Sequence, residues 1–163
     1  MPESARETVE SMSDVESVRF LTHFAREMFK QTDRFAILNS VSGDVAALEE
    51  IRRVRSLDDS ERKARFGPQD SARMARRILE VLADDEVMAP VVEEVWETYR
   101  PDELFVETIL SAGLVAGLLL FVATTDLEGE VMGIRFRKGR ASAEQIRAIA
   151  EPFFESLTKL KGR

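Results

Sequence analysis

The chain's single histidine, His23, and its lack of cysteine restrict the nucleophilic chemistry available to it. Any catalytic triad or nucleophile–base pair that uses histidine must use His23. His23 and Glu27 are four residues apart, which puts both on one face of a helix and can place two metal ligands. A closed metal site needs four ligands, and no second paired motif supplies the others. We therefore interpret His23 as a surface or boundary residue beside a carboxylate, and assign no catalytic, cofactor-binding or metal-ligating residue.

Carboxylates in pairs could perform acid–base chemistry or hold a divalent cation. They are concentrated in one part of the chain, at Asp84, Asp85, Glu86, Glu93, Glu94 and Glu97. At helical spacing the last three share a face opposite three valines, a pattern typical of a solvated helix face. The sequence contains no calcium loop, phosphate loop, dinucleotide fingerprint or nucleophile elbow. A non-enzymatic protein is therefore favoured, and a small-ligand or divalent-metal binding domain remains an alternative.

Basic residues follow one another near the C-terminus, at Arg135, Arg137, Lys138 and Arg140. Arg135 and Arg137 alternate with Ile134 and Phe136, so they project from the opposite face of a strand. With a helix start at Ser142 nearby, this patch is a candidate contact for an anion or an acidic protein surface. The alternative is that these charges only protect a strand edge from aggregation. Phe154 lies beside the main apolar stripe of the last helix and is a second candidate partner contact.

The composition fits one acidic domain of ordinary size. The 163 residues include 30 acidic and 23 basic residues, and the net charge of −7 argues against nonspecific binding to nucleic acid. The absence of cysteine excludes disulfides and is consistent with the cytoplasm, the predicted location. The N-terminus carries charges of both signs and is not a secretory signal. We predict a disordered arm over residues 1–12 and a single globular domain over 13–163.

Apolar periodicity and capping signals predict mainly helices. The predicted helices cover residues 14–31, 44–55 and 70–83, a stretch from Val87 to Tyr99 that either begins near Pro90 or is kinked there, a stretch through Leu104, Phe105, Ile109 and Leu110 capped by Asp102, and 143–160 with a bend at Pro152. The first and last begin with capping boxes, Ser13 to Glu16 and Ser142 to Gln145. A short strand is expected within 34–38, and one helical turn after Asp58-Asp59.

Residues 108–125 form the longest uncharged run, and their length reaches the threshold for a membrane span. Gly113 and Gly117 also match the spacing of helices that pack closely in lipid. The run lacks basic flanks, however, and a turn signal at Asp126–Gly129 calls for a preceding strand. We therefore predict that a helix ends near 113–117, and that a buried strand begins at Leu118 and opens a β-hairpin over about 118–137.

The predicted fold is α+β and predominantly helical: about five helices, then the hairpin, then a C-terminal amphipathic helix. The predicted function is a non-enzymatic regulatory or adaptor-type interaction domain that self-associates through exposed apolar positions on its helices. A protein with an acidic surface is the candidate partner, and no cofactor is expected. A membrane-anchored accessory protein with one span at about 106–125 is the other alternative.

Overall fold

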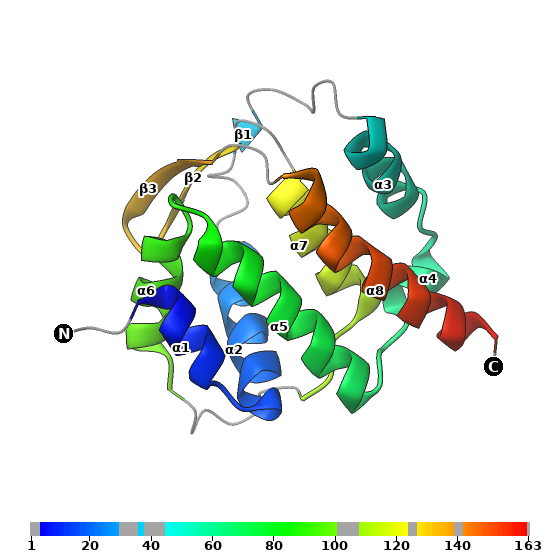
Figure 1. Cartoon of the computed structure of the whole chain (residues 1–163), viewed down its shortest axis with the longest axis horizontal. Helices are drawn as coiled ribbons and strands as arrows, with labels where there is room; N and C mark the ends of the chain where they lie inside the picture. The colour runs from blue at the N-terminus through cyan, green and yellow to red at the C-terminus, as the bar shows by residue number, and fades with distance from the viewer. Residues whose placement is uncertain are drawn as a thin grey trace.

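The computed structural model describes residues 4–29, 36–37, 45–100, 108–123, 127–138 and 142–162, and it is predominantly helical, as predicted. Within these ranges there are eight helices and one three-stranded sheet (Figure 1). The helices are α1 (Ala5–Ser11), α2 (Asp14–Phe29), α3 (Val45–Arg55), α4 (Asp59–Lys63), α5 (Pro68–Asp84), α6 (Ala89–Thr98), α7 (Ala112–Ala123) and α8 (Ala143–Lys161). The strands are β1 (Ala36–Ile37), β2 (Leu127–Val131) and β3 (Ile134–Lys138).

Helix α5 is the centre of the packing, because α1, α2, α6, α7 and α8 all contact it. It begins at Pro68, whose missing N–H costs nothing at a first helical position. The predicted stripe of Met74, Ile78, Leu79 and Leu82 is fully buried. In Figure 1, α5 crosses the front of the molecule, with α1 and α2 on one side and α8 on the other. Buried residues of α1, α2 and α5–α8 form one continuous core.

The helices with a clear apolar stripe are confirmed, within the described residues, at α2, α3, α5, α6 and α8. The Ser13 hydroxyl caps α2 by accepting a hydrogen bond from the Glu16 N–H at 3.2 Å. Helix α6 carries the only tryptophan of the chain, Trp96, whose ring meets Phe20 of α2 edge to face at 5.1 Å. The helical turn expected after Asp58-Asp59 is α4, capped by the Asp58 carboxylate.

The predicted disordered arm at residues 1–12 is wrong for the part that is described. Residues Ala5–Ser11 form α1, which packs on α5 and α6 and buries Ala5, Thr8 and Val9. The Ser4 hydroxyl and the Glu7 carboxylate form a complete capping box at its start. A helix this short is not stable alone, so α1 owes its order to distant residues that local sequence patterns do not show.

The predicted division of residues 108–125 is also wrong, since residues 112–123 form one helix, α7. Most of its side chains are buried by α3, α4, α5 and α8, and a helix buried on all sides shows no periodicity. Gly117 lies inside α7 and does not end a helix. Close approach occurs at Gly113, where a Cβ would lie 3.1 Å from the Arg62 carbonyl of α4.

Just before α7, residues 110–112 pair with residues 64–66 through an isolated antiparallel β-bridge. The Phe66 N–H donates to the Leu110 carbonyl at 3.0 Å, and the Ala112 N–H donates to the Ala64 carbonyl at 2.8 Å. The buried Ser71 hydroxyl donates to the Phe66 carbonyl and accepts from the Leu110 N–H, so it completes this junction. The fifth predicted helix fails at residues 108–110, which are not helical, and its Asp102, Leu104 and Phe105 lie outside the described residues.

The apolarity of α7 does not make it a membrane span. Its twelve residues extend about 18 Å, against about 30 Å for the hydrocarbon core of a bilayer. Across the ranges described here, no helix is both long enough and apolar enough to cross a membrane.

The β-hairpin exists, but it is shorter and later than the predicted 118–137. Strand β2 begins at Leu127, inside the predicted turn, and the actual turn is Met132-Gly133. Both turn residues have left-handed backbones, with φ of 52° and 83°, which suits a two-residue hairpin. Strand β1 pairs antiparallel with the other edge of β2, within the segment where a strand was expected. The hairpin contacts the helices through Phe136, which packs on Phe121 of α7 at 6.2 Å.

Candidate interaction surfaces

The basic residues predicted as an anion or partner site lie on and after β3. Arg135 and Arg137 are exposed on the face opposite buried Phe136, as expected from their alternation. Lys138 ends β3, but its side chain and all of Arg140 lie outside the described residues. The strand register puts Glu130 directly opposite Arg135, and Glu128 directly opposite Arg137.

This register agrees with the alternative that the charges of β3 have a structural role. Residues of opposite charge at directly paired positions generally stabilise a hairpin. The nearby start of α8 is also satisfied internally, because the Ser142 hydroxyl accepts from the Gln145 N–H. Binding of an acidic partner by Arg135 and Arg137 therefore stays a prediction, with the edge-protection role as its alternative.

Phe154, the other predicted contact, is half-buried within a groove of about 250 Å³ between α3, α4 and α8. The Arg53 guanidinium lies over its ring, 3.8 Å from the centroid, and Phe153 meets it edge to face at 4.9 Å. Lys161 and Glu61 close the same groove with an ion pair of 2.7 Å. Phe154 is thus partly covered by its own chain, and contact with a partner remains a prediction.

His23 is half-buried in α2, with its ring 5.4 Å from that of Tyr99. Among the described residues its buried Nε2 atom has no hydrogen-bond partner. The described ranges also contain no group of three histidine or carboxylate side chains placed to hold a metal ion.

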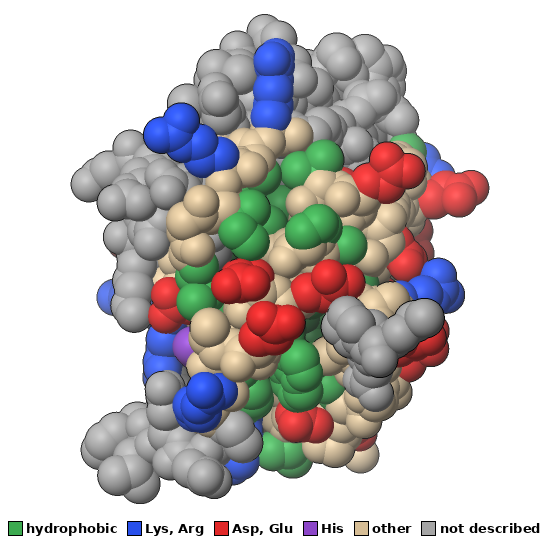
Figure 2. Space-filling view, turned by 90° about the vertical axis from the view of Figure 1, so that its left-hand side faces the viewer, with side chains coloured by type: hydrophobic (Ala, Val, Ile, Leu, Met, Phe, Trp, Pro, Cys, Tyr) green, Lys and Arg blue, Asp and Glu red, His purple; other side chains and the backbone are tan. Residues whose placement is uncertain are grey.

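Several of the clustered carboxylates have structural roles. Asp85 accepts hydrogen bonds from the Val87 and Met88 N–H groups, and so shapes the entry to α6. Figure 2 shows acidic side chains among apolar ones on the face of the molecule that carries α6. On this helix Glu94 and Glu97 are partly or fully exposed, as expected of a solvated face, whereas Glu93 holds α1.

Three side chains of α5 and α6 bind α1 through hydrogen bonds and an ion pair. We call these residues, Arg76, Asp84 and Glu93, the α1 clamp. At the helix start, Glu93 accepts a hydrogen bond from the Ala5 N–H at 2.9 Å. At the helix end, Arg76 donates to the Met12 carbonyl at 2.6 Å. Asp84 pairs with Arg6 at 3.2 Å between these two ends. A carboxylate at the N-terminal end and a guanidinium at the C-terminal end match the helix dipole.

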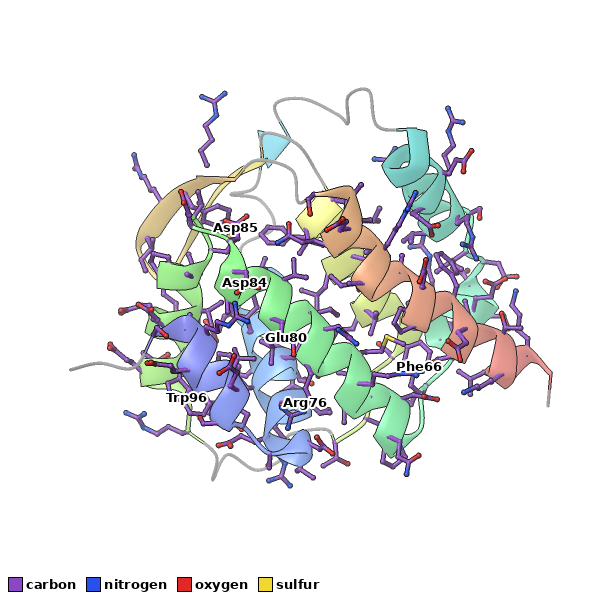
Figure 3. The ribbon with its side chains drawn as sticks, in the orientation of Figure 1. Phe66, Arg76, Glu80, Asp84, Asp85 and Trp96 are labelled. Atoms are coloured by element: carbon purple, nitrogen blue, oxygen red, sulfur yellow. The ribbon has the colours of Figure 1, made fainter. Side chains whose placement is uncertain are left out.

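Two members of the clamp, Arg76 and Asp84, lie along one line of α5 with Glu80 between them, and Glu93 lies on α6. Figure 3 shows Arg76, Glu80 and Asp84 successively along α5, where they are spaced by one turn each. A hollow of about 150 Å³ remains between α1 and α5, and Glu10, Glu80 and Val9 line it. Sequence patterns do not reveal this clamp, because its members are 64–88 residues from the segment that they hold.

A larger and more apolar hollow, the α2–α5 groove, lies between the first turns of α2 and α5. It encloses about 390 Å³. Its lining is Asp14, Val15, Val18, Arg19, Pro68, Gln69, Ala72 and Thr108. Val15 stands at this groove with 49% of its surface exposed, although Val18, one turn later, is buried. The signal for Val15 was present, because it continues the apolar stripe of α2 by one turn toward the N-terminus.

The charged residues of the α2–α5 groove are of opposite sign. Asp14 pairs with Arg76 at 2.9 Å, and its side chain remains 73% exposed. Arg19 is half-buried, and its buried Nε atom finds no hydrogen-bond acceptor in the described part of the chain. An apolar hollow with both an accessible carboxylate and an incompletely satisfied guanidinium suits contact with another protein surface.

No family model, characterised protein or solved structure matches this chain.

Proposed function

We propose that the protein is a non-enzymatic interaction domain of the regulatory or adaptor type, and that it self-associates through the α2–α5 groove. The observation that carries this proposal is the exposed Val15 beside the apolar hollow lined by Val18, Pro68 and Ala72. A single exposed valine is common on protein surfaces. An exposed valine beside an apolar hollow gives the same surface both a side chain that can insert and a hollow that can accept one. The cytoplasm is the compartment that we propose, in keeping with the lack of cysteine.

The shape of this surface favours a second copy of the chain as its occupant. In a twofold dimer the same patch meets itself, so each patch must hold both the projection and the receptor. The α2–α5 groove satisfies this condition, because Val15 of one copy can enter the hollow of the other. The hollow has the size of a few apolar side chains, so it would form the centre of a wider contact between α2 and α5 surfaces.

The charged residues of the α2–α5 groove also favour a second copy of the chain as its occupant. Across a twofold axis, Asp14 of each copy can approach Arg19 of the other, which yields two equivalent ion pairs. Each pair would join a carboxylate that is largely exposed to the guanidinium of a half-buried arginine whose Nε finds no acceptor among the described residues. Such complementarity selects for a correctly oriented second copy, despite the net charge of −7 on each chain.

Val15→Asp tests the proposal, with Val87→Asp as a matched control. Both valines are exposed, at 49% and 37%, but Val87 lies in the turn between α5 and α6, outside the groove. Each copy would bury the exposed half of its Val15, so the two valines together contribute about 1.5–3 kcal/mol, and Val15→Asp should weaken dimerisation by about tenfold to a hundredfold. Sedimentation equilibrium of the wild-type and variant chains measures this effect.

We expect the wild-type and Val87→Asp chains to form dimers, and the Val15→Asp chain to be largely monomeric at the same concentration. Unchanged helical circular dichroism in all three would show that the fold is intact. A monomeric wild-type chain would overturn self-association, and equal dimerisation of both variants would remove the groove from the interface.

A further inference from the structure

We propose that the two copies exchange their N-terminal helices, so that α1 of each copy lies in the α1 clamp of the other. This inference rests on the self-association proposed above, and it identifies the segment that crosses between the copies. The binding surface is the clamp on α5 and α6, and the partner that fits it is the segment Ser4–Met12 of a second copy.

The clamp recognises features that α1 carries whichever chain supplies it. Glu93 binds the backbone N–H at the start of the helix, and Arg76 binds the carbonyl that follows its end. The burial of Ala5, Val9 and Met12 adds an apolar contribution. All of these interactions join α1 to α5 or α6, so an α1 from a second copy would reproduce every one of them.

The position of the hinge favours exchange. Only Met12 and Ser13 separate α1 from α2, and we call these two residues the hinge. Met12 is already extended, with φ −69° and ψ 140°. Two linking residues bridge about 10 Å at most, so α1 can cross only where the hinges of two copies lie close together. Asp14 and Val15, which follow this hinge directly, line the α2–α5 groove. A twofold axis at that groove would therefore bring the two hinges together.

Arg76 contacts residues on both sides of the hinge, so after exchange it would contact both chains. Its guanidinium binds the Met12 carbonyl on the α1 side of the hinge and the Asp14 carboxylate on the α2 side. After exchange, each Arg76 would hold Asp14 of its own chain and Met12 of the other. The same two contacts would then tie the copies together, and exchange would create no unsatisfied group.

The experiment uses the full chain with Glu10→Cys and Glu80→Cys together. Glu10 on α1 and Glu80 on α5 are both largely exposed and line the same hollow, and the natural chain contains no cysteine. Neither residue belongs to the clamp, so Arg76, Asp84 and Glu93 keep their contacts. A short bis-maleimide then joins the two cysteines at a protein concentration where sedimentation shows the dimer. The products are separated by mass under denaturing conditions.

With exchange, the two cross-links join two chains, and the product shifts from 18.4 kDa to twice that mass. The Glu10→Cys chain alone should remain uncross-linked under the same treatment. A dimer whose cross-linked product keeps the mass of one chain would overturn exchange and leave self-association standing. A double variant and a wild-type chain that are both monomeric before cross-linking would overturn exchange and self-association together.

Discussion

Helices α1 and α7 are held in place by different forces. Helix α7 has no charged residue, and eight of its twelve residues are buried among α3, α4, α5 and α8. Helix α1 has seven residues, three of them charged, and buries one side of itself against α5 and α6. Its ends are fixed by hydrogen bonds from Arg76 and to Glu93.

The difference between these helices separates two kinds of stability. Removal of α7 would open the core on several sides, so its unfolding is the unfolding of the protein. Helix α1 can leave at the cost of a few buried side chains and a few polar contacts, while α5 and α6 stay packed. Segments of such low local stability are those from which moving and exchanging elements are drawn. Changes in α7 should therefore have global effects, and changes around α1 should have local effects.

Leu118→Asp should have the largest effect. Leu118 is fully buried in α7, so the variant places an unpaired charge in the core and removes apolar contacts. The cost is on the order of 5 kcal/mol, which is comparable to the whole stability of many domains. We expect loss of the cooperative thermal transition in circular dichroism. A folded variant with a melting temperature near that of the wild type would show that α7 is not the core helix.

Arg76→Ala should have an intermediate and local effect. It removes the hydrogen bond to the Met12 carbonyl and the ion pair with Asp14, worth together about 1–3 kcal/mol. Amide hydrogen exchange should quicken in α1, from Thr8 onward, with little change in α7. Equal acceleration in both helices would show that α1 and α7 open as one unit, contrary to the comparison.

Ser4→Ala should have the smallest effect, and α8 offers a matched control. Ser4 and Ser142 start α1 and α8 with the same capping box, and loss of such a cap costs about 1 kcal/mol. Because α8 belongs to the core, Ser142→Ala should lower the melting temperature of the whole protein. Ser4→Ala should instead raise hydrogen exchange in α1 alone. Equal melting temperatures for the two variants would contradict this distinction.

The fold was predictable where the burial of an element is one-sided. Helices α2, α5 and α8 each bury one face, so their apolar residues recur at helical spacing, and Ser13 and Ser142 mark two of their starts. Prediction failed where this asymmetry is missing. In α7 burial on all sides removes the periodicity, and the Asp126–Gly129 turn signal then suggested a strand that the run does not form.

The surfaces were less predictable than the fold. Arg135 and Arg137 are exposed as alternation requires, but the neighbouring Glu128 and Glu130 depend on the register of β2, which a single strand pattern does not specify. The α1 clamp depends on contacts between residues far apart in the chain. Val15 followed the visible stripe of α2, and only the packing of α5 beside it determines that it stays exposed.

The edge-to-face contact of Trp96 with Phe20 has an optical consequence. The only indole of the chain lies on α6 one turn beyond Glu93, the residue that receives the start of α1. Because this ring is half-buried, its emission responds to changes in local hydration. The protein thus contains an intrinsic fluorophore beside the α1 clamp, and dissociation of α1 from the clamp can be followed without a dye.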